Sequence, residues 1–130
     1  DGYVYFAMEY VPGIPLDAFC NRMRLSIRDR VGLAIRICEA VSHAHEKGVI
    51  HRDMKPSNIL VFQRRGEAIP KVIDFGIAKA LSTDEHQSVH LTFATQWVGT
   101  SRYASPEQRD WASDVDQRSD VYSLGIVLLE

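Results

Sequence analysis

The pattern of apolar and polar residues divides the first third of the chain into a strand, a break and two helices. The β-branched and aromatic run from Tyr3 to Met8 predicts a strand. Two prolines and a glycine between Tyr10 and Pro15 predict a linker rather than a regular element, and a short helix is expected after it.

A long helix is expected between residues 26 and 48. Ser26 followed by Asp29 is typical of a helix N-terminus, and Gly48 supplies a stop. Apolar residues recur between them at helical spacing, so we expect this set to face the core: Ile27, Val31, Ala34, Ile35, Cys38 and Val41.

Three short runs of β character follow, at residues 49–50, 59–62 and 71–73. The polar stretch QRRGEAIP (63–70) predicts a hairpin between the last two. From Gly76 to Pro106 the periodicity fades into a loop rich in Ser, Thr, His and Gln, whose length favours a functional or disordered segment. Residues 119–130 (SDVYSLGIVLLE) predict a helix that is apolar nearly all round and therefore buried. A strand at the very start and an uncapped helix at the end lead us to expect a piece of a larger domain.

Composition narrows the class of protein. With 130 residues and 45% hydrophobic content, the chain can form one compact unit. A net charge of -2 and scattered Lys and Arg give no basis for binding nucleic acid. No apolar run approaches the roughly 18 residues of a membrane span, and no signal peptide is visible, so we expect a cytoplasmic location for this domain. Cys20 and Cys38 are interpreted as small buried hydrophobes rather than a bridge or a metal site.

Polar residues of three kinds gather in the stretch HRDMKPSN, between two predicted strands. Asp53 can orient a hydroxyl and accept its proton, Lys55 can neutralise phosphate charge, and the Asn58 oxygen can ligate magnesium. After the next strand, DFG adds Asp74 as an ionised ligand and Gly76 as a position free to turn sharply. Together these residues could clamp a polyphosphate.

The order of the motifs carries more weight than any one of them. H-R-D-x-K-x-x-N, a hairpin, D-F-G, a long loop, G-T, S-P-E and an Asp that opens a helix follow one another. This order resembles a protein kinase over the whole chain, specifically the bacterial type of eukaryotic-like Ser/Thr kinase. The resemblance implies an α+β, protein-kinase-like fold. Residues 1–15 would be the last small-lobe strand and the hinge, and residues 16–130 the first half of the mainly helical large lobe.

The resemblance also implies a role for each matching residue. Asp53 and Lys55 would be catalytic, and Asn58 and Asp74 would hold the Mg²⁺ ions that bridge the ATP phosphates. Glu9 and Val11 would bind the adenine edge through their backbone, with Leu60 packed under the purine and Met8 behind it. Supporting roles are implied for a further set: His51, Phe75, Gly76, Thr100, Glu107 and Asp120.

Lys55-Pro56 and Thr100 resemble the Ser/Thr-directed members, so protein substrates with Ser or Thr are expected. Arg52 beside the catalytic acid suggests control by phosphorylation of the long loop, in which autophosphorylation in trans is a further possibility. The candidate acceptors in that loop are Thr92, Thr95 and Ser101, with Ser88 behind them.

Some features depart from the family pattern or stay open. S-P-E replaces the commoner A-P-E, and the 130 residues contain neither a G-x-G-x-x-G loop nor a V-A-I-K lysine, so these residues alone are expected to be inactive. A pseudokinase or regulatory scaffold remains the alternative. His43 and His45 are interpreted as packing or solvent residues rather than zinc ligands, and so are His86 and His90.

Overall fold

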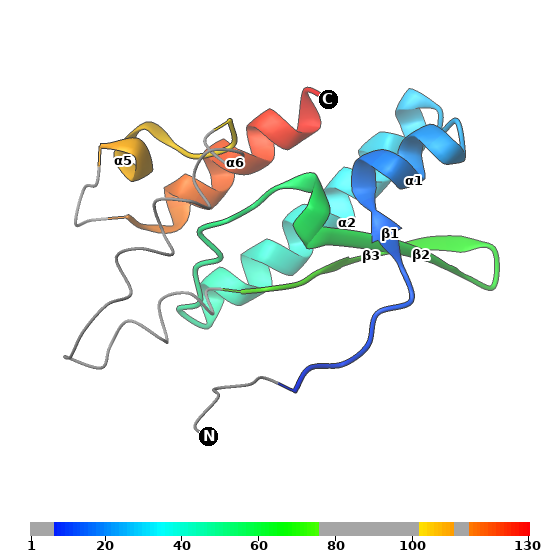
Figure 1. The fold of residues 1–130 in the computed structure, drawn as a ribbon, viewed down its shortest axis with the longest axis horizontal. Helices are drawn as coiled ribbons and strands as arrows, with labels where there is room; N and C mark the ends of the chain where they lie inside the picture. The colour runs from blue at the N-terminus through cyan, green and yellow to red at the C-terminus, as the bar shows by residue number, and fades with distance from the viewer. Residues whose placement is uncertain (1–6, 76–101, 111–114) are drawn as a thin grey trace, which may run out of the picture.

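The structure, a computed structural model, describes residues 7–75, 102–110 and 115–130. It has a small antiparallel sheet, two helices between the first and second strands in sequence, and two more near the C-terminus (Figure 1). The sheet order is β1-β2-β3, and β3 packs against the long helix α2. The fold is thus of the α+β class.

The two helices at the start form as the sequence predicts. α1 spans Leu16–Arg22 and α2 spans Ile27–Glu46. The Ser26 hydroxyl accepts a hydrogen bond from the Asp29 backbone N–H at 3.2 Å, which satisfies one of the free donors of the first turn. Gly48 has a φ of 74°, a left-handed conformation that suits glycine and ends the helix.

The face that α2 buries differs from the prediction. Of the predicted inner face, Val41 lies in the core and Ala34 is half-buried, but the other four residues are solvent-exposed: Ile27, Val31, Ile35 and Cys38. Leu33 and Ile37 lie in the core in their place. Both sets recur at helical spacing, so periodicity alone could not choose between them. The neighbouring elements determine which face of α2 is buried, because α1, the hairpin and the last helix all contribute to the cluster around Ile37.

The predicted hairpin is confirmed and is longer than the apolar runs suggested. β2 (Ile59–Arg64) pairs with β3 (Glu67–Val72). The connecting residues Arg65 and Gly66 have φ angles of 53° and 85°, as in the two-residue turns with positive φ that match the twist of a hairpin.

Two expectations about short β segments were wrong. Val49 and Ile50 form no strand, because the Val49 N–H is already bonded to the Ala44 carbonyl at the end of α2. Conversely, β1 (Ile14–Pro15) is a strand inside the predicted linker, paired with Val61 and Leu60 of β2.

The approach of β1 to β2 depends on Gly13. A Cβ atom there would lie 3.0 Å from the Leu60 Cβ and 3.1 Å from the Val61 oxygen. A larger residue would therefore push β1 away from the sheet. Of the predicted first strand, residues 3–6 lie outside the described part of the chain, and Ala7 and Met8 belong to no regular element.

The last two helices pack polar as well as apolar residues inward. α5 spans Pro106–Arg109 and α6 spans Gln117–Leu128. α6 buries Ser119, Asp120 and Ser123 together with Leu124 and Val127. Its other apolar side chains reach solvent, with Val121 63% exposed. We expected this helix to be buried on all sides, and in the structure it is buried on one side only.

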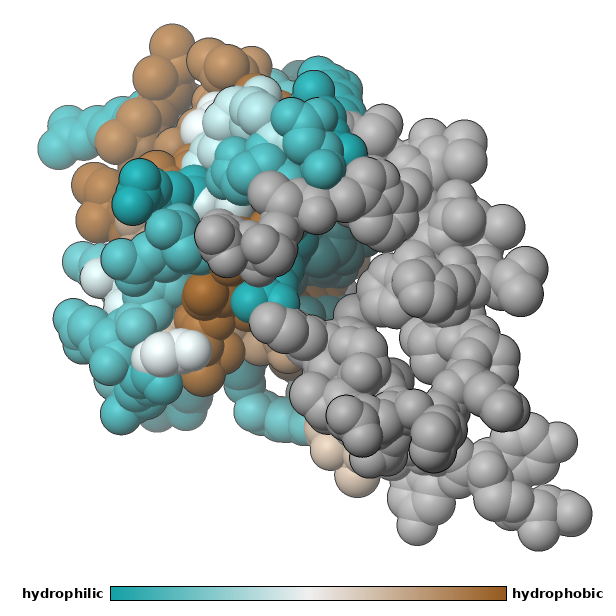
Figure 2. Space-filling model, turned by 90° about the vertical axis from the view of Figure 1, so that its left-hand side faces the viewer, coloured by the Kyte–Doolittle hydropathy of each residue, from teal (hydrophilic) through white to brown (hydrophobic). Residues whose placement is uncertain are grey.

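Apolar residues lie at the surface beside polar ones on the face that Figure 2 shows. Within the described ranges, no helix combines the length and the apolar character needed to cross a membrane.

Candidate active site

The loop from His51 to Asn58 brings an acid, a lysine and an amide into contact. The 3-10 helix η1 (Pro56–Asn58) closes this loop directly before β2. The Lys55 ammonium lies 2.7 Å from Oδ2 of Asp53, and Nδ2 of Asn58 donates to the same oxygen at 3.1 Å. Both contacts are to Oδ2, so Oδ1 of Asp53 binds neither Lys55 nor Asn58. The Asp53 side chain is 43% exposed, which leaves it accessible.

Asn58 is held so that its amide oxygen points away from Asp53. Its Nδ2 also donates to the Asp53 carbonyl at 2.8 Å, and both acceptors require the NH₂ side of the amide. Its backbone carbonyl accepts from the Ile73 N–H at 3.0 Å, which ties η1 to the residue before Asp74. One backbone hydrogen bond thereby joins Asn58 to the segment that leads to Asp74.

These residues fit a magnesium ion that is shared with a nucleotide. Asn58 offers a neutral oxygen and Asp74, which is exposed, offers a carboxylate. In the described ranges no three His, Cys, Asp or Glu side chains gather into a metal site. Magnesium commonly binds one or two protein oxygens and completes its shell with water and phosphate oxygens. The donor set therefore suits Mg²⁺ bound with polyphosphate better than a metal held by protein alone.

Asp120, at the start of α6, holds the backbone of the loop through hydrogen bonds. Its Oδ1 accepts from the Arg52 N–H at 2.7 Å, and its Oδ2 accepts from the His51 N–H at 2.8 Å and from Nε2 of His45 at 2.8 Å. Asp120 is fully buried. Arg52 has a φ of 67°, a region that few residues other than glycine occupy. The buried carboxylate thus holds a strained backbone in place.

His51 links the loop to the segment after β3. Its Nε2 lies 2.8 Å from the Ile73 carbonyl, which can only accept, so Nε2 carries a hydrogen. Its Nδ1 accepts from the Asp53 N–H at 3.2 Å. In this pair of contacts Nε2 is the donor and Nδ1 the acceptor. It also contacts the Phe75 ring, with 4.8 Å between the ring centroids.

The Glu107 side chain of α5 accepts a hydrogen bond from α6. The Ser119 hydroxyl donates to its Oε1 at 2.6 Å. This hydrogen bond, with help from a backbone N–H, lowers the pKa of Glu107 below its ordinary value. Ser119 of α6 is thus a hydrogen-bond partner of Glu107.

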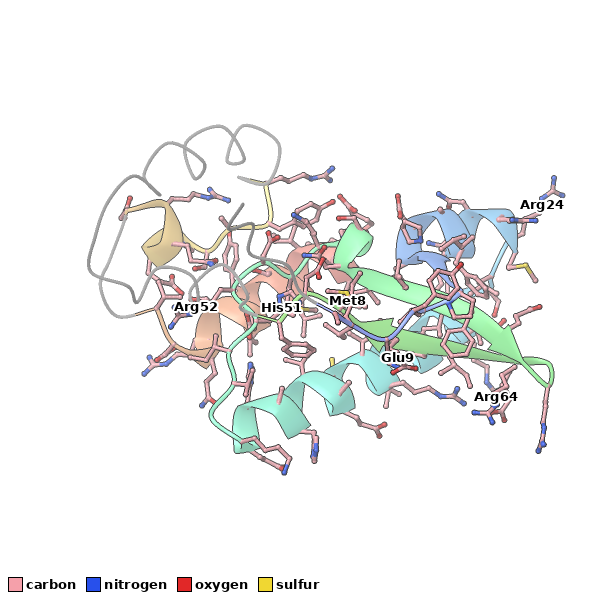
Figure 3. The ribbon with its side chains drawn as sticks, turned by 60° about the horizontal axis from the view of Figure 1, so that its bottom comes forward. Met8, Glu9, Arg24, His51, Arg52 and Arg64 are labelled. Carbon is pink, nitrogen blue, oxygen red and sulfur yellow. The ribbon has the colours of Figure 1, made fainter. Side chains whose placement is uncertain are left out.

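The residues expected at the adenine site lie on the segment before β1 and on β2. Figure 3 shows Met8 and Glu9 on this segment, where Glu9 forms an ion pair with Lys71 of β3. Met8 is 58% exposed, and Val11 and Leu60 are partly buried. The structure thus brings the segment against the sheet but does not enclose it.

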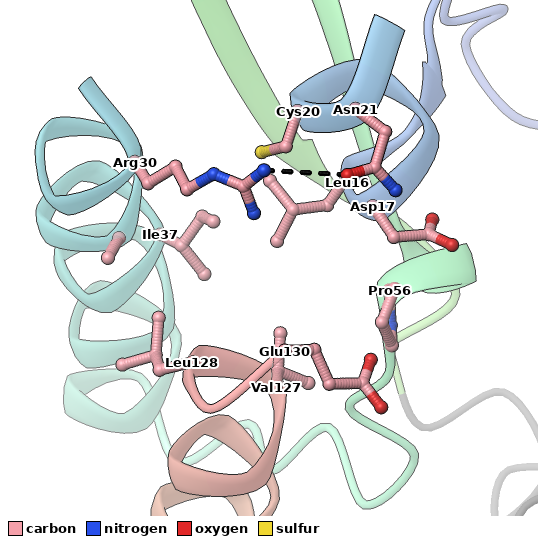
Figure 4. Close-up of a pocket in the computed structure, with 11 residues that line it drawn as sticks. Leu16, Asp17, Cys20, Asn21, Arg30, Ile37, Pro56, Val127, Leu128 and Glu130 are labelled. Atoms are coloured by element: carbon pink, nitrogen blue, oxygen red, sulfur yellow. Dashed lines mark hydrogen bonds between the residues drawn. The ribbon is translucent and has the colours of Figure 1, made fainter. Parts of the chain in front are cut away.

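A cavity of about 90 Å³ lies elsewhere, between α1, α2, η1 and the end of α6 (Figure 4). Cys20, Ile37 and Val127 line it, and Arg30 reaches across to Asn21 at 3.4 Å. Small-molecule sites usually measure roughly 300–1,000 Å³, so this cavity is too small for a nucleotide.

Several of the expected site residues lie outside the described part of the chain: Gly76, Ser88, Thr92, Thr95, Thr100 and Ser101. The same holds for His86 and His90.

Sequence reasoning missed one side chain that binds the loop and one that binds Asp120 beneath it. His45 binds Asp120, and Nε2 of Gln108 donates to the Arg52 carbonyl at 2.6 Å. His45 sits 75 residues from Asp120 in sequence, so no local pattern could reveal the pair. For Gln108 one signal existed, because Ser105 and Gln108 have the spacing of a capping box.

Comparisons with known proteins identify the family of the chain. The family model described as "Protein kinase domain" matches residues 1–130. The chain is 44% identical over its whole length to the serine/threonine-protein kinase pkn3 of Myxococcus xanthus. It is 44% identical over 97% of its length to PknB of Mycolicibacterium smegmatis, and 42% identical over 97% to PknB of Mycobacterium tuberculosis.

The chain spans 24% of the length of pkn3 and 19% of the length of each of these two PknB proteins. A match over all 130 residues, together with these identities, shows that the chain belongs to the protein kinase domain family.

Proposed function

We propose that the protein containing this chain transfers the γ-phosphoryl group of ATP to Ser or Thr hydroxyls of protein substrates. The observation that carries the proposal is the contact of Asp53, Lys55 and Asn58 within one loop, at 2.7 and 3.1 Å. Relatives named as serine/threonine-protein kinases at 39–44% identity support this substrate class.

Each group in the loop has a separate task in the transfer. Oδ1 of Asp53 orients the attacking hydroxyl and accepts its proton, while Lys55 offsets the negative charge of the transferred group. Asn58 and Asp74 supply the oxygens for Mg²⁺, which neutralises phosphate charge when bound. Asp120 and His51 hold the backbone that aims Asp53. Most of the catalysis is therefore positioning and electrostatics.

The residues before β1 and on β2 would take the adenine. The backbone of Glu9 and Val11 would bind the edge of the base, Leu60 would pack against its face, and Met8 would lie behind it. This assignment makes residues 1–15 the end of the small lobe and the hinge, and residues 16–130 part of the large lobe.

The test is a substitution that removes the proton acceptor and little else. Asp53→Asn keeps the size of the side chain, so we expect Mg·ATP to bind as in the wild type while transfer to a Ser/Thr peptide falls by roughly 10²-fold or more. Glu39→Gln, a similar change on the exposed surface of α2, is the control and should leave the rate unchanged. Full turnover in Asp53→Asn, or a wild type that binds no Mg·ATP, would refute the proposal.

A pseudokinase or regulatory scaffold would give a different result. Its wild type would bind partners, with or without ATP, and transfer nothing. The presence of Asp53, Lys55, Asn58 and Asp74 together favours the enzyme.

The 130 residues by themselves contain no glycine-rich loop and no small-lobe lysine, so we propose that they need additional sequence to be active. Phosphorylation of a Ser/Thr peptide by this piece alone would contradict that part of the proposal.

Regulation by phosphorylation belongs to the same proposal. Arg52 can pair with a phosphate on Thr92, Thr95 or Ser101, added in trans by a second copy. Mapping of phosphate in the active protein tests it, and an unmodified loop in fully active protein would count against it.

A further inference from the structure

The side chain of Gln108 uses both ends of its amide group. Its Oε1 accepts from the Ser105 backbone N–H at 3.0 Å, which forms part of the N-terminal cap of α5. Its Nε2 donates to the Arg52 carbonyl at 2.6 Å. A side chain fixed at both ends cannot turn freely, so it connects α5 rigidly to the loop from His51 to Asn58, here called the catalytic loop.

The carbonyl that Gln108 binds belongs to the peptide unit directly before Asp53. The N–H at the other end of this unit donates to Nδ1 of His51 at 3.2 Å. Asp120 binds the Arg52 N–H, but its carboxylate has no hydrogen to donate to the Arg52 carbonyl. Among the residues that the structure describes, Gln108 is thus the side chain that restrains this carbonyl. A rotation of the peptide would swing the Asp53 carboxylate out of line.

We propose that Gln108 is a positioning residue for phosphoryl transfer: it locks the Arg52–Asp53 peptide and so aims the Asp53 carboxylate, coupling α5 to the catalytic loop. This inference rests on the proposed function for its effect on rate. A displacement of about 1 Å in a reacting group can cost on the order of 10²-fold in rate, and the loss of one such hydrogen bond permits only part of that movement.

Two substitutions of Gln108 remove the donor in different ways. Gln108→Glu keeps an acceptor for the Ser105 N–H, since Glu and Gln both serve in a capping box, but it cannot donate to the Arg52 carbonyl when ionised. Gln108→Met has a similar length and neither polar group. Ser105→Ala is the control, because it removes the hydroxyl that accepts from the Gln108 N–H while the backbone N–H and the bridge to Arg52 remain.

The experiment measures hydrogen exchange of the Asp53 amide and steady-state kinetics in the full-length protein. Both Gln108 variants should speed exchange of the Asp53 amide roughly three- to tenfold and lower kcat by a similar factor, with KM for ATP unchanged. Ser105→Ala should leave that exchange at the wild-type rate. Unfolding midpoints show that each variant is folded.

The outcomes separate this inference from the proposed function. If exchange at Asp53 is unchanged in both Gln108 variants, or if Ser105→Ala speeds it equally, the bridge does not hold the peptide and the inference is wrong. If exchange rises but kcat stays the same, Gln108 does not position Asp53 and the inference is again wrong. If the wild type transfers no phosphate, the proposed function fails, while the exchange data still decide whether Gln108 locks the peptide.

Discussion

Replacement of Asp120 by alanine should destabilise the protein more than any surface change. The carboxylate is fully buried and accepts three hydrogen bonds of 2.7–2.8 Å, from the backbone of His51 and Arg52 and from His45. Alanine provides no acceptor. Two backbone N–H groups and an imidazole N–H would lose their partner at once.

The size of the effect follows from these contacts. A buried donor left without a partner costs about 1–3 kcal/mol, and Asp120→Ala leaves three donors without their acceptor. Arg52 adds to this, because its left-handed backbone is itself unfavourable by roughly 1–2 kcal/mol and is held by the same carboxylate. We expect a loss of about 3–5 kcal/mol, since Arg52 is partly exposed and water can replace some of the lost hydrogen bonds. Typical domains have only about 5–15 kcal/mol of stability in total.

Urea unfolding followed by far-UV circular dichroism measures the change. Asp116→Asn is the matched control, because Asp116 caps the same helix from an exposed position and asparagine caps equally well. The control should change the free energy of unfolding by less than about 0.5 kcal/mol. An Asp120→Ala variant that unfolds within about 0.5 kcal/mol of the wild type would show that the three hydrogen bonds do not hold the loop.

Two further predictions concern pH and thiol reactivity. The hydrogen bond from Ser119 lowers the pKa of Glu107 below 4.5, so Glu107 stabilises the fold in full above pH 4.5 and loses this contribution as the pH falls through the folded-state pKa. Ser119→Ala should raise the pKa of Glu107 in an NMR titration, and an unchanged value would contradict the assignment. Burial raises the pKa of the Cys20 thiol, whereas Cys38 is exposed, so iodoacetamide should modify Cys38 at least about tenfold faster in the native protein. Equal rates, measured by mass spectrometry, would mean that Cys20 is not buried.

Elements with strong local signals could be predicted from the sequence. Ser26, Asp29 and Gly48 mark the ends of α2 through hydrogen bonds and φ angles within a few residues, and the Arg65-Gly66 turn does the same for the hairpin. The contact between Asp53, Lys55 and Asn58 was also predictable, because six positions of chain cannot separate them far.

Choices between equivalent local patterns could not be predicted. α2 carries two apolar stripes, and only packing shows that Ile37 faces the core while Ile35 faces solvent. The pair Val49-Ile50 has β character but forms no strand, because the Val49 N–H already donates to the Ala44 carbonyl at the end of α2.

The sequence by itself determined the family and the composition of the candidate site: the motif order identifies the family, and short-range spacing places the acid, the lysine and the amide in one loop. The tertiary structure decided what holds that loop in position. The resemblance implied a supporting role for Asp120, but the contact of His45 with Asp120 and that of Gln108 with the Arg52 carbonyl, each across more than 50 residues, come from the structure. Hydrogen bonds at such separations depend on how helices pack, and no local pattern in the chain encodes that packing.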